Sequence, residues 1–187
     1  MTTAESNMLP WSIWRRAAAE DGVDGDLANL YRRLDEQVAL RGPTCWISGR
    51  CCNFDAYGHL LYVTGLEVAW VVRQVGQSTT TAAALRENLN EQPDTRIAPD
   101  APRDTQAACP FQTGTLCGIH AVRPLGCRVF FCEQGTQEWQ QELYESFLTD
   151  LRSLHDVHDL PYRYLEWREA LRLEKEDRLG QGNERKE

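Results

Sequence analysis

The segment CPFQTGTLCGIHAVRPLGCRVFFC, residues 109–132, carries four of the protein's seven cysteines together with one histidine. The other three cysteines stand in CWISGRCC, residues 45–52, so the first 44 and the last 55 residues contain none. Cysteines that serve only as small buried side chains would be scattered along the chain. The clustering therefore indicates that the sulfur atoms act together, and we expect the fold to be organised around them.

Length and charge narrow the class of protein. A chain of 187 residues, 42% of them hydrophobic, can bury the core of one compact domain, so we expect a single domain over residues 1–187. Twenty basic and twenty-eight acidic side chains give a net charge of −8. Because this charge repels phosphate backbones and anionic membrane surfaces, we expect neither nucleic acid nor a membrane as a partner.

The beginning of the sequence shows no sign of export or membrane insertion. The stretch MTTAESNMLPWSIWRRAAAE, residues 1–20, lacks a basic region followed by an apolar one, and no run of about 18 apolar residues occurs in the chain. We therefore expect a cytoplasmic protein whose thiols are kept reduced. An odd number of cysteines also fits disulfides poorly, so metal or iron–sulfur ligation is favoured over redox or disulfide chemistry and over inert packing.

Apolar residues at helical spacing predict helices on both sides of the cysteines. The expected helices cover residues 27–38, 66–75, 82–89, 139–154 and 164–171. The predicted fold is mainly α, an α+β arrangement in which helices frame a small, irregular, cysteine-rich metal-binding centre with short hairpin-like segments. Trp139 and Trp167 lie on the apolar stripes of the last two helices and are expected to fill the core.

Specific residues mark the ends of two of these helices. Asp24 or Asp26 is expected to cap the first helix, and Gly42-Pro43 is expected to end it. Thr64 and Glu67 form a capping-box pattern, in which each side chain accepts a hydrogen bond from a backbone N–H of the other residue at a helix start. The second helix is therefore expected to begin just after Thr64.

The segments between the helices have recognisable compositions. Residues 54–63, FDAYGHLLYV, read as a short hairpin or an extended segment. Residues 91–106 carry three prolines and little apolar content, which predicts a surface loop between the two cysteine groups. The cysteine-cluster core is expected to span residues 45–132, and residues 174–187 are expected to form a disordered, charged tail.

A metal ion or an iron–sulfur cluster needs several thiolates that converge, and closely spaced cysteines can supply them. A turn at Thr113-Gly114-Thr115 would bring Cys109 and Cys117 across from each other. Cys117 and His120 have the C-x2-H spacing that is common in zinc sites. Adjacent side chains usually diverge, so for Cys51 and Cys52 there are three possibilities: one ligates and the other packs, the two serve two metals, or the backbone is irregular there. The candidate metal ligands are Cys45, Cys51, Cys52, Cys109, Cys117, Cys127, Cys132 and His120.

Positive side chains are also expected near these sulfurs. Four thiolates around a divalent ion leave a net charge of −2, which is costly to bury without nearby donors. Three arginines lie within four residues of a cysteine and are candidate donors, with surface ion pairs as the alternative role: Arg50, Arg123 and Arg128. The histidines outside the cluster, His59, His155 and His158, are expected to be exposed.

The order CWISGRCC, VTGLE and CPFQTGTLCGIHAVRPLGCRVF resembles the cysteine-cluster family of zinc- or iron-chelating proteins, the YkgJ-like or CxxCxxCC family. In that family a C-x2-C-x2-CC group precedes a helix that begins with a threonine and an acidic residue, and a CPF…C-x-I-Y-x-x-RP-x-x-CR-x-F block follows. The resemblance covers about residues 45–131. It implies that the ligands of Zn²⁺ or of an iron–sulfur cluster include Cys45, Cys51, Cys52, Cys109, Cys117 and Cys127.

The sequence departs from the family pattern at two points. Ser48 stands where the family has its second cysteine, and a serine hydroxyl is a poor ligand for soft metal sites. His120 occupies the tyrosine position of the C-x-I-Y element, and Cys132 follows the end of the block. Either residue could replace the missing donor, and a tyrosine in the relatives suggests that position 120 serves packing.

Three functions remain open at this stage. The first is a non-enzymatic metalloprotein with a structural or metal-handling role. The second is an iron–sulfur oxidoreductase or an accessory to a protein-modification reaction, and the third is a thiol-based redox sensor. Because the sequence has no Gly-rich nucleotide loop and little room for a separate cofactor domain, a non-enzymatic role is favoured and no catalytic residue is assigned.

Overall fold

The structure is a computed structural model that describes residues 9–77 and 108–184. It is mainly helical, as predicted, with two small two-stranded sheets. The helix predicted over 82–89 and the loop predicted over 91–106 lie outside the described residues. The five longest described helices are α1 (Trp11–Ala17), α2 (Asp21–Arg41), α4 (Gly65–Gln77), α7 (Gln137–Val157) and α8 (Trp167–Glu184).

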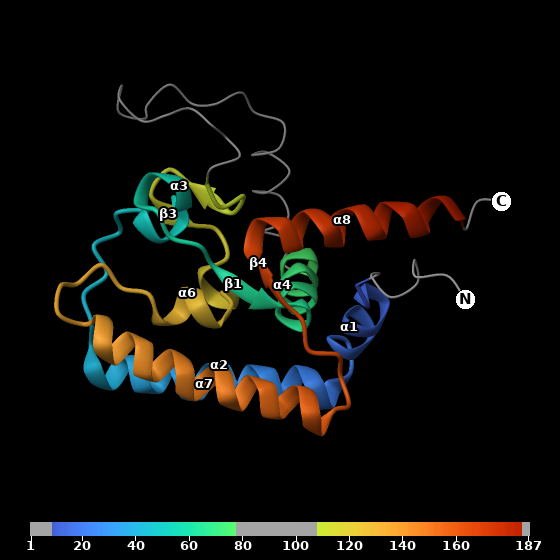
Figure 1. Cartoon of the computed structure of the whole chain (residues 1–187), viewed down its shortest axis with the longest axis horizontal. Coiled ribbons are helices and arrows are strands. Elements are labelled where there is room, and N and C mark those ends of the chain that lie inside the picture. Colours follow the sequence, from blue (N-terminus) through green and yellow to red (C-terminus); the bar gives the residue numbers. More distant parts are fainter. Residues whose placement is uncertain (1–8, 78–107, 185–187) are drawn as a thin grey trace.

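These five helices, which we call the helical frame, pack in two groups. Figure 1 shows α2 and α7 lying side by side in opposite directions, with α1, α4 and α8 on the other side of the molecule. Apolar side chains fill the space between them, and the largest fully buried ones include Trp14, Leu27, Leu34, Leu66, Leu151 and Trp167. None of the described helices is both long and apolar enough to span a bilayer.

A short sheet joins two distant parts of the chain. Strand β1 (Tyr62–Thr64) pairs antiparallel with β4 (Tyr164–Glu166), with Val63 opposite Leu165. The hairpin predicted as one possibility within residues 54–63 is therefore wrong. Residues 54–57 form a helix, and the strand that follows pairs with residues 164–166. The last helix begins at Trp167 instead of 164, since the residues before it belong to β4.

The cysteines lie in and between short elements at one end of the frame, a region that we call the cysteine centre (residues 44–61 and 108–133). These elements are η2 (Arg50–Cys52), α3 (Phe54–Tyr57), β2 (Gln112–Thr113), β3 (Leu116–Cys117), η3 (His120–Val122) and α6 (Leu125–Val129). Strands β2 and β3 form the predicted hairpin, and Gly114 in its turn has a positive φ of 59°. Such a turn suits glycine because a side chain strains this conformation.

The predicted helix ends are partly right. Gly42 ends α2 in the left-handed conformation, with φ 61°, as its sequence position suggested. The predicted cap is wrong, because α2 begins at Asp21 and both aspartates point elsewhere. Asp24 accepts a hydrogen bond from the Trp70 indole at 2.6 Å, and Asp26 pairs with His158 at 2.8 Å.

The prediction of a disordered tail from residue 174 is wrong for its first part. Residues 174–184 belong to α8. Glu174 is only 1% exposed and forms an ion pair with Arg15 of α1 at 3.6 Å and another with Arg178 at 2.5 Å. A buried contact to another helix thus orders this part of α8, which charge composition alone does not reveal.

Candidate metal centre

Four thiols from the two cysteine groups meet around Cys52. The Cys52 thiol is near enough to those of Cys109, Cys117 and Cys51 for all three to shift its pKa, and the adjacent Cys51 and Cys52 sulfurs lie 3.9 Å apart. Neighbouring side chains rarely converge in regular structure. Here they do so because Cys51 and Cys52 lie in a single 3₁₀ turn, η2.

Main-chain contacts hold the two cysteine groups together. The Cys109 N–H donates to the Cys52 carbonyl at 2.7 Å, which fixes the start of the second group against the end of the first. The Gln112 side chain donates to the Gly49 carbonyl at 3.3 Å and to the Gly114 carbonyl at 2.9 Å. In the hairpin, Cys117 lies opposite Gln112. The hairpin thereby places the Cys117 thiol near that of Cys52.

The fifth cysteine near this group is Cys127 of α6. Its thiol is partly buried, and its ionised form would be repelled electrostatically by Cys109, Cys117 and Cys51. Burial is the largest cause that raises the pKa of Cys127 well above 9.0. Cys127 thus stands beside the four-thiol group as a neutral thiol.

The other three predicted ligands, besides Cys127, have different surroundings. Cys45 is exposed, and Cys132 has its sulfur 3.5 Å from the Ser48 hydroxyl. His120 lies on η3 with much of its side chain exposed, and partial burial of the ring together with the nearby Arg123 lowers its pKa. Ligation by these three residues stays a prediction.

The protonation of the four thiols is uneven because they share hydrogen bonds. The hydrogen bond from Cys52 lowers the pKa of Cys51 from 9.0 to about 6 and that of Cys117 to about 7, and it also lowers the pKa of Cys109. The same contacts, first that with Cys109, raise the pKa of Cys52. Cys52 is therefore the thiol of the group that holds its proton most strongly.

The predicted metal centre is not evident in this arrangement. Across residues 9–77 and 108–184, no three or more His, Cys, Asp or Glu side chains are grouped so that they could hold a metal ion as they stand. The sulfur atoms lie around Cys52, whereas the ligands of a metal ion are directed at one common point. The structure thus brings sulfurs together without showing a metal geometry.

The three arginines predicted as donors have different roles. The positive charge of Arg123 lowers the pKa values of Cys51 and Cys117. Arg50 lies over the Tyr57 ring at 5.2 Å. Arg128 is only 3% exposed and donates to the Arg123 carbonyl, so it supports the loop that carries Arg123.

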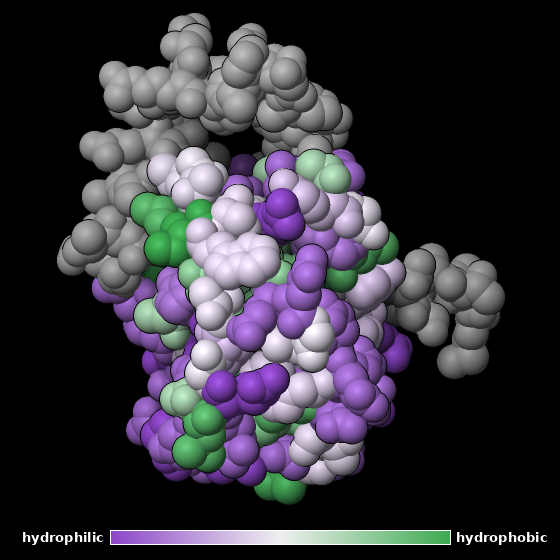
Figure 2. Space-filling view, turned by 90° about the vertical axis from the view of Figure 1, so that its left-hand side faces the viewer, coloured by the Kyte–Doolittle hydropathy of each residue, from purple (hydrophilic) through white to green (hydrophobic). Residues whose placement is uncertain are grey.

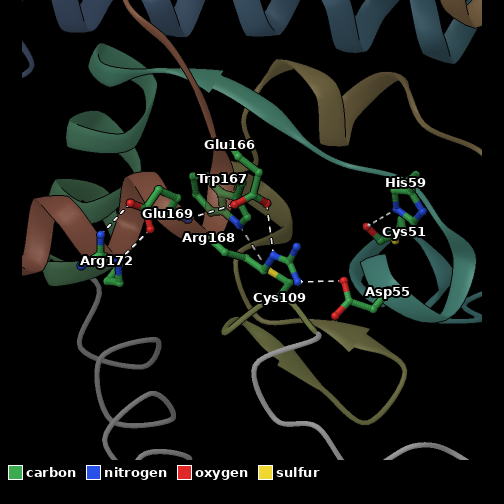
Figure 3. Close-up of polar contacts among 9 residues, drawn as sticks. All are labelled: Cys51, Asp55, His59, Cys109, Glu166, Trp167, Arg168, Glu169 and Arg172. Carbon is green, nitrogen blue, oxygen red and sulfur yellow. Dashed lines mark hydrogen bonds and ion pairs between the residues drawn. The ribbon is translucent and has the colours of Figure 1, made fainter.

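Two contacts at the cysteines, one to a sulfur and one to a main-chain carbonyl, were missed by sequence reasoning. The Trp167 indole N–H donates to the Cys109 sulfur at 3.3 Å, and a His59 ring nitrogen lies 3.5 Å from the Cys51 carbonyl oxygen (Figure 3). The His59 ring also stacks on Phe130 with centroids 5.2 Å apart, so it is not a freely solvated residue. Trp167 was expected in the core, and no local pattern could link it to a cysteine 58 residues away.

A buried carboxylate connects the frame to the cysteine centre. The predicted capping box is confirmed, since Glu67 accepts from the Thr64 N–H at 2.8 Å and donates its own N–H to the Thr64 hydroxyl at 3.2 Å. The other carboxylate oxygen accepts from the Tyr31 hydroxyl and from the Leu125 N–H, each at 2.9 Å. Glu67 therefore anchors the first residue of α6, the helix that carries Cys127.

A second polar connection runs over the surface. Arg168 of α8 contacts Asp55 of α3 and Glu166 of β4, both at 3.1 Å (Figure 3). On the adjacent turn of α8, Arg172 pairs with Glu169 and Glu176 in exposed positions. Arg168 thus joins α8 to the segment just after Cys51 and Cys52.

Comparison with known proteins found no relative of this chain. No protein-family model matches the chain, and no curated protein or solved structure shows significant similarity to it.

Proposed function

We propose that this protein binds a metal ion through Cys51, Cys52, Cys109 and Cys117, in a structural or metal-handling role. The observation that carries the proposal is the meeting of two cysteine groups that are far apart in the sequence: the Cys109 N–H donates to the Cys52 carbonyl at 2.7 Å, and the Cys51 and Cys52 sulfurs lie 3.9 Å apart. Inert cysteines would not need to meet in this way. The YkgJ-like resemblance, drawn from the motifs alone, points to the same chemistry.

The spacing of the sulfurs favours a single ion. A tetrahedral zinc site with Zn–S bonds of about 2.3 Å has sulfurs about 3.8 Å apart. The Cys51 and Cys52 sulfurs, 3.9 Å apart, already have this separation. Loss of the thiol protons and a small reorientation of the side chains would direct all four at one point. An iron–sulfur cluster is a larger body that requires more widely separated thiolates, and it is the alternative cofactor.

A metal here would stabilise a part of the chain that has little regular structure of its own. The elements of the cysteine centre are two to five residues long. In small metal-bound regions the free energy of metal binding contributes directly to folding. Arg123 supplies positive charge beside the sulfurs, and the Trp167 indole supplies a donor to Cys109. Both features would offset the charge of a thiolate site.

The test is metal analysis of protein purified without oxygen. We expect about one zinc per chain, no visible absorption and no acid-labile sulfide. Cys52→Ser should retain less than about a tenth of that metal, because it removes the thiol that contacts the other three. Cys132→Ser is the matched control and should keep its metal. Iron with matching sulfide would instead support the iron–sulfur alternative, and equal metal loss in both variants would contradict the assigned ligand set.

A thiol-based redox sensor is the second candidate, favoured by the 3.9 Å separation of adjacent Cys51 and Cys52. Hydrogen peroxide would take two electrons and two protons from these thiols, giving a disulfide and two waters. Metal-free protein that loses the mass of two hydrogens on mild oxidation, at this pair by peptide mapping, would favour this function. Bound metal that protects the pair would favour the first.

A further inference from the structure

A buried histidine stands at the end of α7 that lies away from the cysteine centre (Figure 1). His155 is 0% exposed, and neither of its ring nitrogens has a hydrogen-bond partner within the described residues. Buried polar side chains nearly always have such a partner, so an unpaired one needs an explanation. Because His155 takes no part in the proposed metal site, the explanation lies in another property of the fold.

The ring is covered by the segment that joins α7 to β4, residues 158–163, which we call the connector. The Leu160 N–H donates to the His155 carbonyl at 2.8 Å, and the Tyr162 ring meets the imidazole edge-on with centroids 5.2 Å apart. Figure 1 shows the connector running from the end of α7 past α1 to β4. The imidazole is thus enclosed between its own helix and this segment.

The closed connector offers little compensation for a positive charge on this ring. The Pro161 carbonyl already accepts a hydrogen bond from the Trp14 indole at 2.8 Å. Burial is the largest cause that lowers the pKa of His155 below its ordinary value of 6.5. It outweighs the opposing effects of the Leu160 and Pro161 main chain and of Asp156. In the closed form the imidazole is therefore neutral over a wider pH range than a solvated one.

The charged groups around the ring would compensate such a charge only weakly. Asp156 is the one whose field favours the charged ring, and it is exposed. Arg152 lies over the Tyr162 ring at 5.5 Å, and its own charge has the wrong sign. The other charged or titratable groups on the connector and on α1 are Asp159, Arg163 and Arg16, which are exposed, His158, which pairs with Asp26 of α2 at 2.8 Å, and Arg15, which pairs with Asp177 at 2.5 Å.

The connector leads to the contacts that join the helical frame to the cysteine centre. The Gly65 N–H donates to the Arg163 carbonyl at 3.2 Å, and β4 then pairs with β1. Directly after β4 comes Trp167, whose indole donates to the Cys109 sulfur at 3.3 Å. Opening of the connector would therefore loosen the start of β4 and, through it, the position of Trp167.

We propose that His155 forms an acid-sensitive latch, in which protonation of the buried imidazole releases the connector and the strand β4 that follows it. The ring takes up one proton from water, and it holds this proton only with the connector open, where solvent surrounds the charge. The latch goes beyond the proposed metal binding, because it uses no cysteine.

Release of the connector would change the molecular surface. At the cysteine-centre end, hydrophobic residues form separate patches among hydrophilic ones (Figure 2). Trp14, which is fully buried and hydrogen-bonded to the connector, would become accessible near the opposite end of α7. The open form would thus expose an apolar surface that the closed form hides, and a hydrophobic dye should bind it.

The experiment measures amide hydrogen-exchange protection factors of the full-length protein at about pH 7.5 and about pH 5.5. Below pH 6.5 the open form binds a proton more readily than the closed form, so the fraction of open protein should rise as the pH falls. Protection of residues 160–166 should fall about threefold to tenfold, since one proton gives at most about a tenfold change per pH unit. Residues 68–75 of α4 should keep their protection.

Two variants assign the response to His155. His155→Phe keeps a flat ring of similar size that does not titrate, so its protection factors should be alike at the two pH values. His158→Gln is the matched control, because it removes the next imidazole along the chain and should keep the acid response. A fall of equal size in wild type and His155→Phe, no fall in wild type, or a fall spread equally over α4 would overturn the proposal.

If His155→Phe fails to fold, the ring nitrogen chemical shifts of His155 in wild type provide the decision. Proton uptake by the ring that coincides with lost protection at residues 160–166 supports the latch. A ring that stays neutral while protection falls, or that gains a proton while protection holds, overturns it. The measurements are repeated on chelator-treated protein, where the same response is expected, and a response confined to metal-loaded protein would also overturn the latch.

Discussion

The helical frame and the cysteine centre are stabilised by different means. The frame consists of helices of 7 to 21 residues, packed through fully buried side chains such as Trp14, Leu27 and Leu151. The cysteine centre consists of elements of two to five residues, held by a few specific contacts such as the Cys109 N–H to Cys52 carbonyl bond. Burial of apolar area is non-directional, whereas the second region depends on individual hydrogen bonds and on sulfur contacts.

This difference indicates that the two regions tolerate change differently. A substitution in the frame should cost stability according to the apolar volume it removes. A substitution in the cysteine centre should have its main effect on the arrangement of the sulfurs. The residues that join the regions, Trp167 and Glu67, should affect both, and they offer the strongest tests.

The largest effect is expected for Trp167→Ala. The indole is fully buried, packs on Phe111 with centroids 5.9 Å apart and donates to the Cys109 sulfur. Its removal leaves a cavity where the two regions meet, so we expect the free energy of unfolding to fall by about 3–5 kcal/mol. Urea unfolding followed by far-ultraviolet circular dichroism measures the change.

Trp139→Ala is the control for Trp167→Ala. Trp139 is only partly buried and contacts Phe131 and Arg41 at the edge of the frame. Its loss should cost less than half as much, because less apolar area is removed from contact. If the free energy of unfolding falls equally in the two variants, Trp167 does not stabilise the contact between the two regions more than Trp139 stabilises the edge of the frame.

The frame was largely predictable from the sequence because amphipathic periodicity reports directly on helices packed against a core. The stripes at 27–38 and 139–154 lie within α2 and α7, and the capping box marks the start of α4. Long-range pairing was not predictable in this way. Nothing near Tyr62 reveals that its strand pairs with residues 164–166.

The cysteine centre was predictable in composition but not in geometry. Clustering correctly indicated that cysteines from both groups lie together, and the turn at Gly114 gave the hairpin. Spacing alone could not separate Cys45 and Cys132 from the four thiols, because these positions depend on irregular backbone. His155 was also misjudged, since the chain after α7 folds back and buries it against Tyr162.

The second prediction concerns Glu67→Gln and its dependence on pH. In Glu67 the two carboxylate oxygens accept four hydrogen bonds, from Thr64, Tyr31 and Leu125. An amide of the same size can accept through one atom only, so the variant should lose about 1–3 kcal/mol of stability. The loss should appear in both regions, because this carboxylate joins α4 to α6.

The pH dependence follows from the raised pKa of Glu67. Burial, the largest cause, raises this pKa above its ordinary value of 4.5. Between the unfolded and folded pKa values the folded state binds more protons, so stability from this group is greatest below the unfolded pKa and falls as the pH rises through the folded one. Glutamine does not titrate. The stability difference between wild type and Glu67→Gln should therefore narrow as the pH rises above 4.5, and a constant difference would contradict the assignment.

The smallest effect is expected from a pair of glycines within the cysteine centre, Gly49 and Gly114, with φ values of 69° and 59°. Alanine at either site costs about 1 kcal/mol for the left-handed backbone. At Gly49 an added Cβ would also lie 2.7 Å from the Gln112 amide nitrogen and 3.1 Å from the Thr115 Cα, whereas at Gly114 nothing lies within 4 Å.

The free energy of unfolding should therefore be about 1 kcal/mol lower for Gly49→Ala than for Gly114→Ala. The reason is that the Thr115 Cα is a backbone atom, which cannot move aside as freely as the end of a side chain. Hydrogen exchange locates the change, which should fall on residues 108–129 in Gly49→Ala and spare α2 and α7. Since Gln112 holds Gly49 against the hairpin, Gly49→Ala should also retain less metal than Gly114→Ala. If exchange in the helical frame rises as much as in the cysteine centre, the two regions unfold as one unit and the distinction between them is wrong.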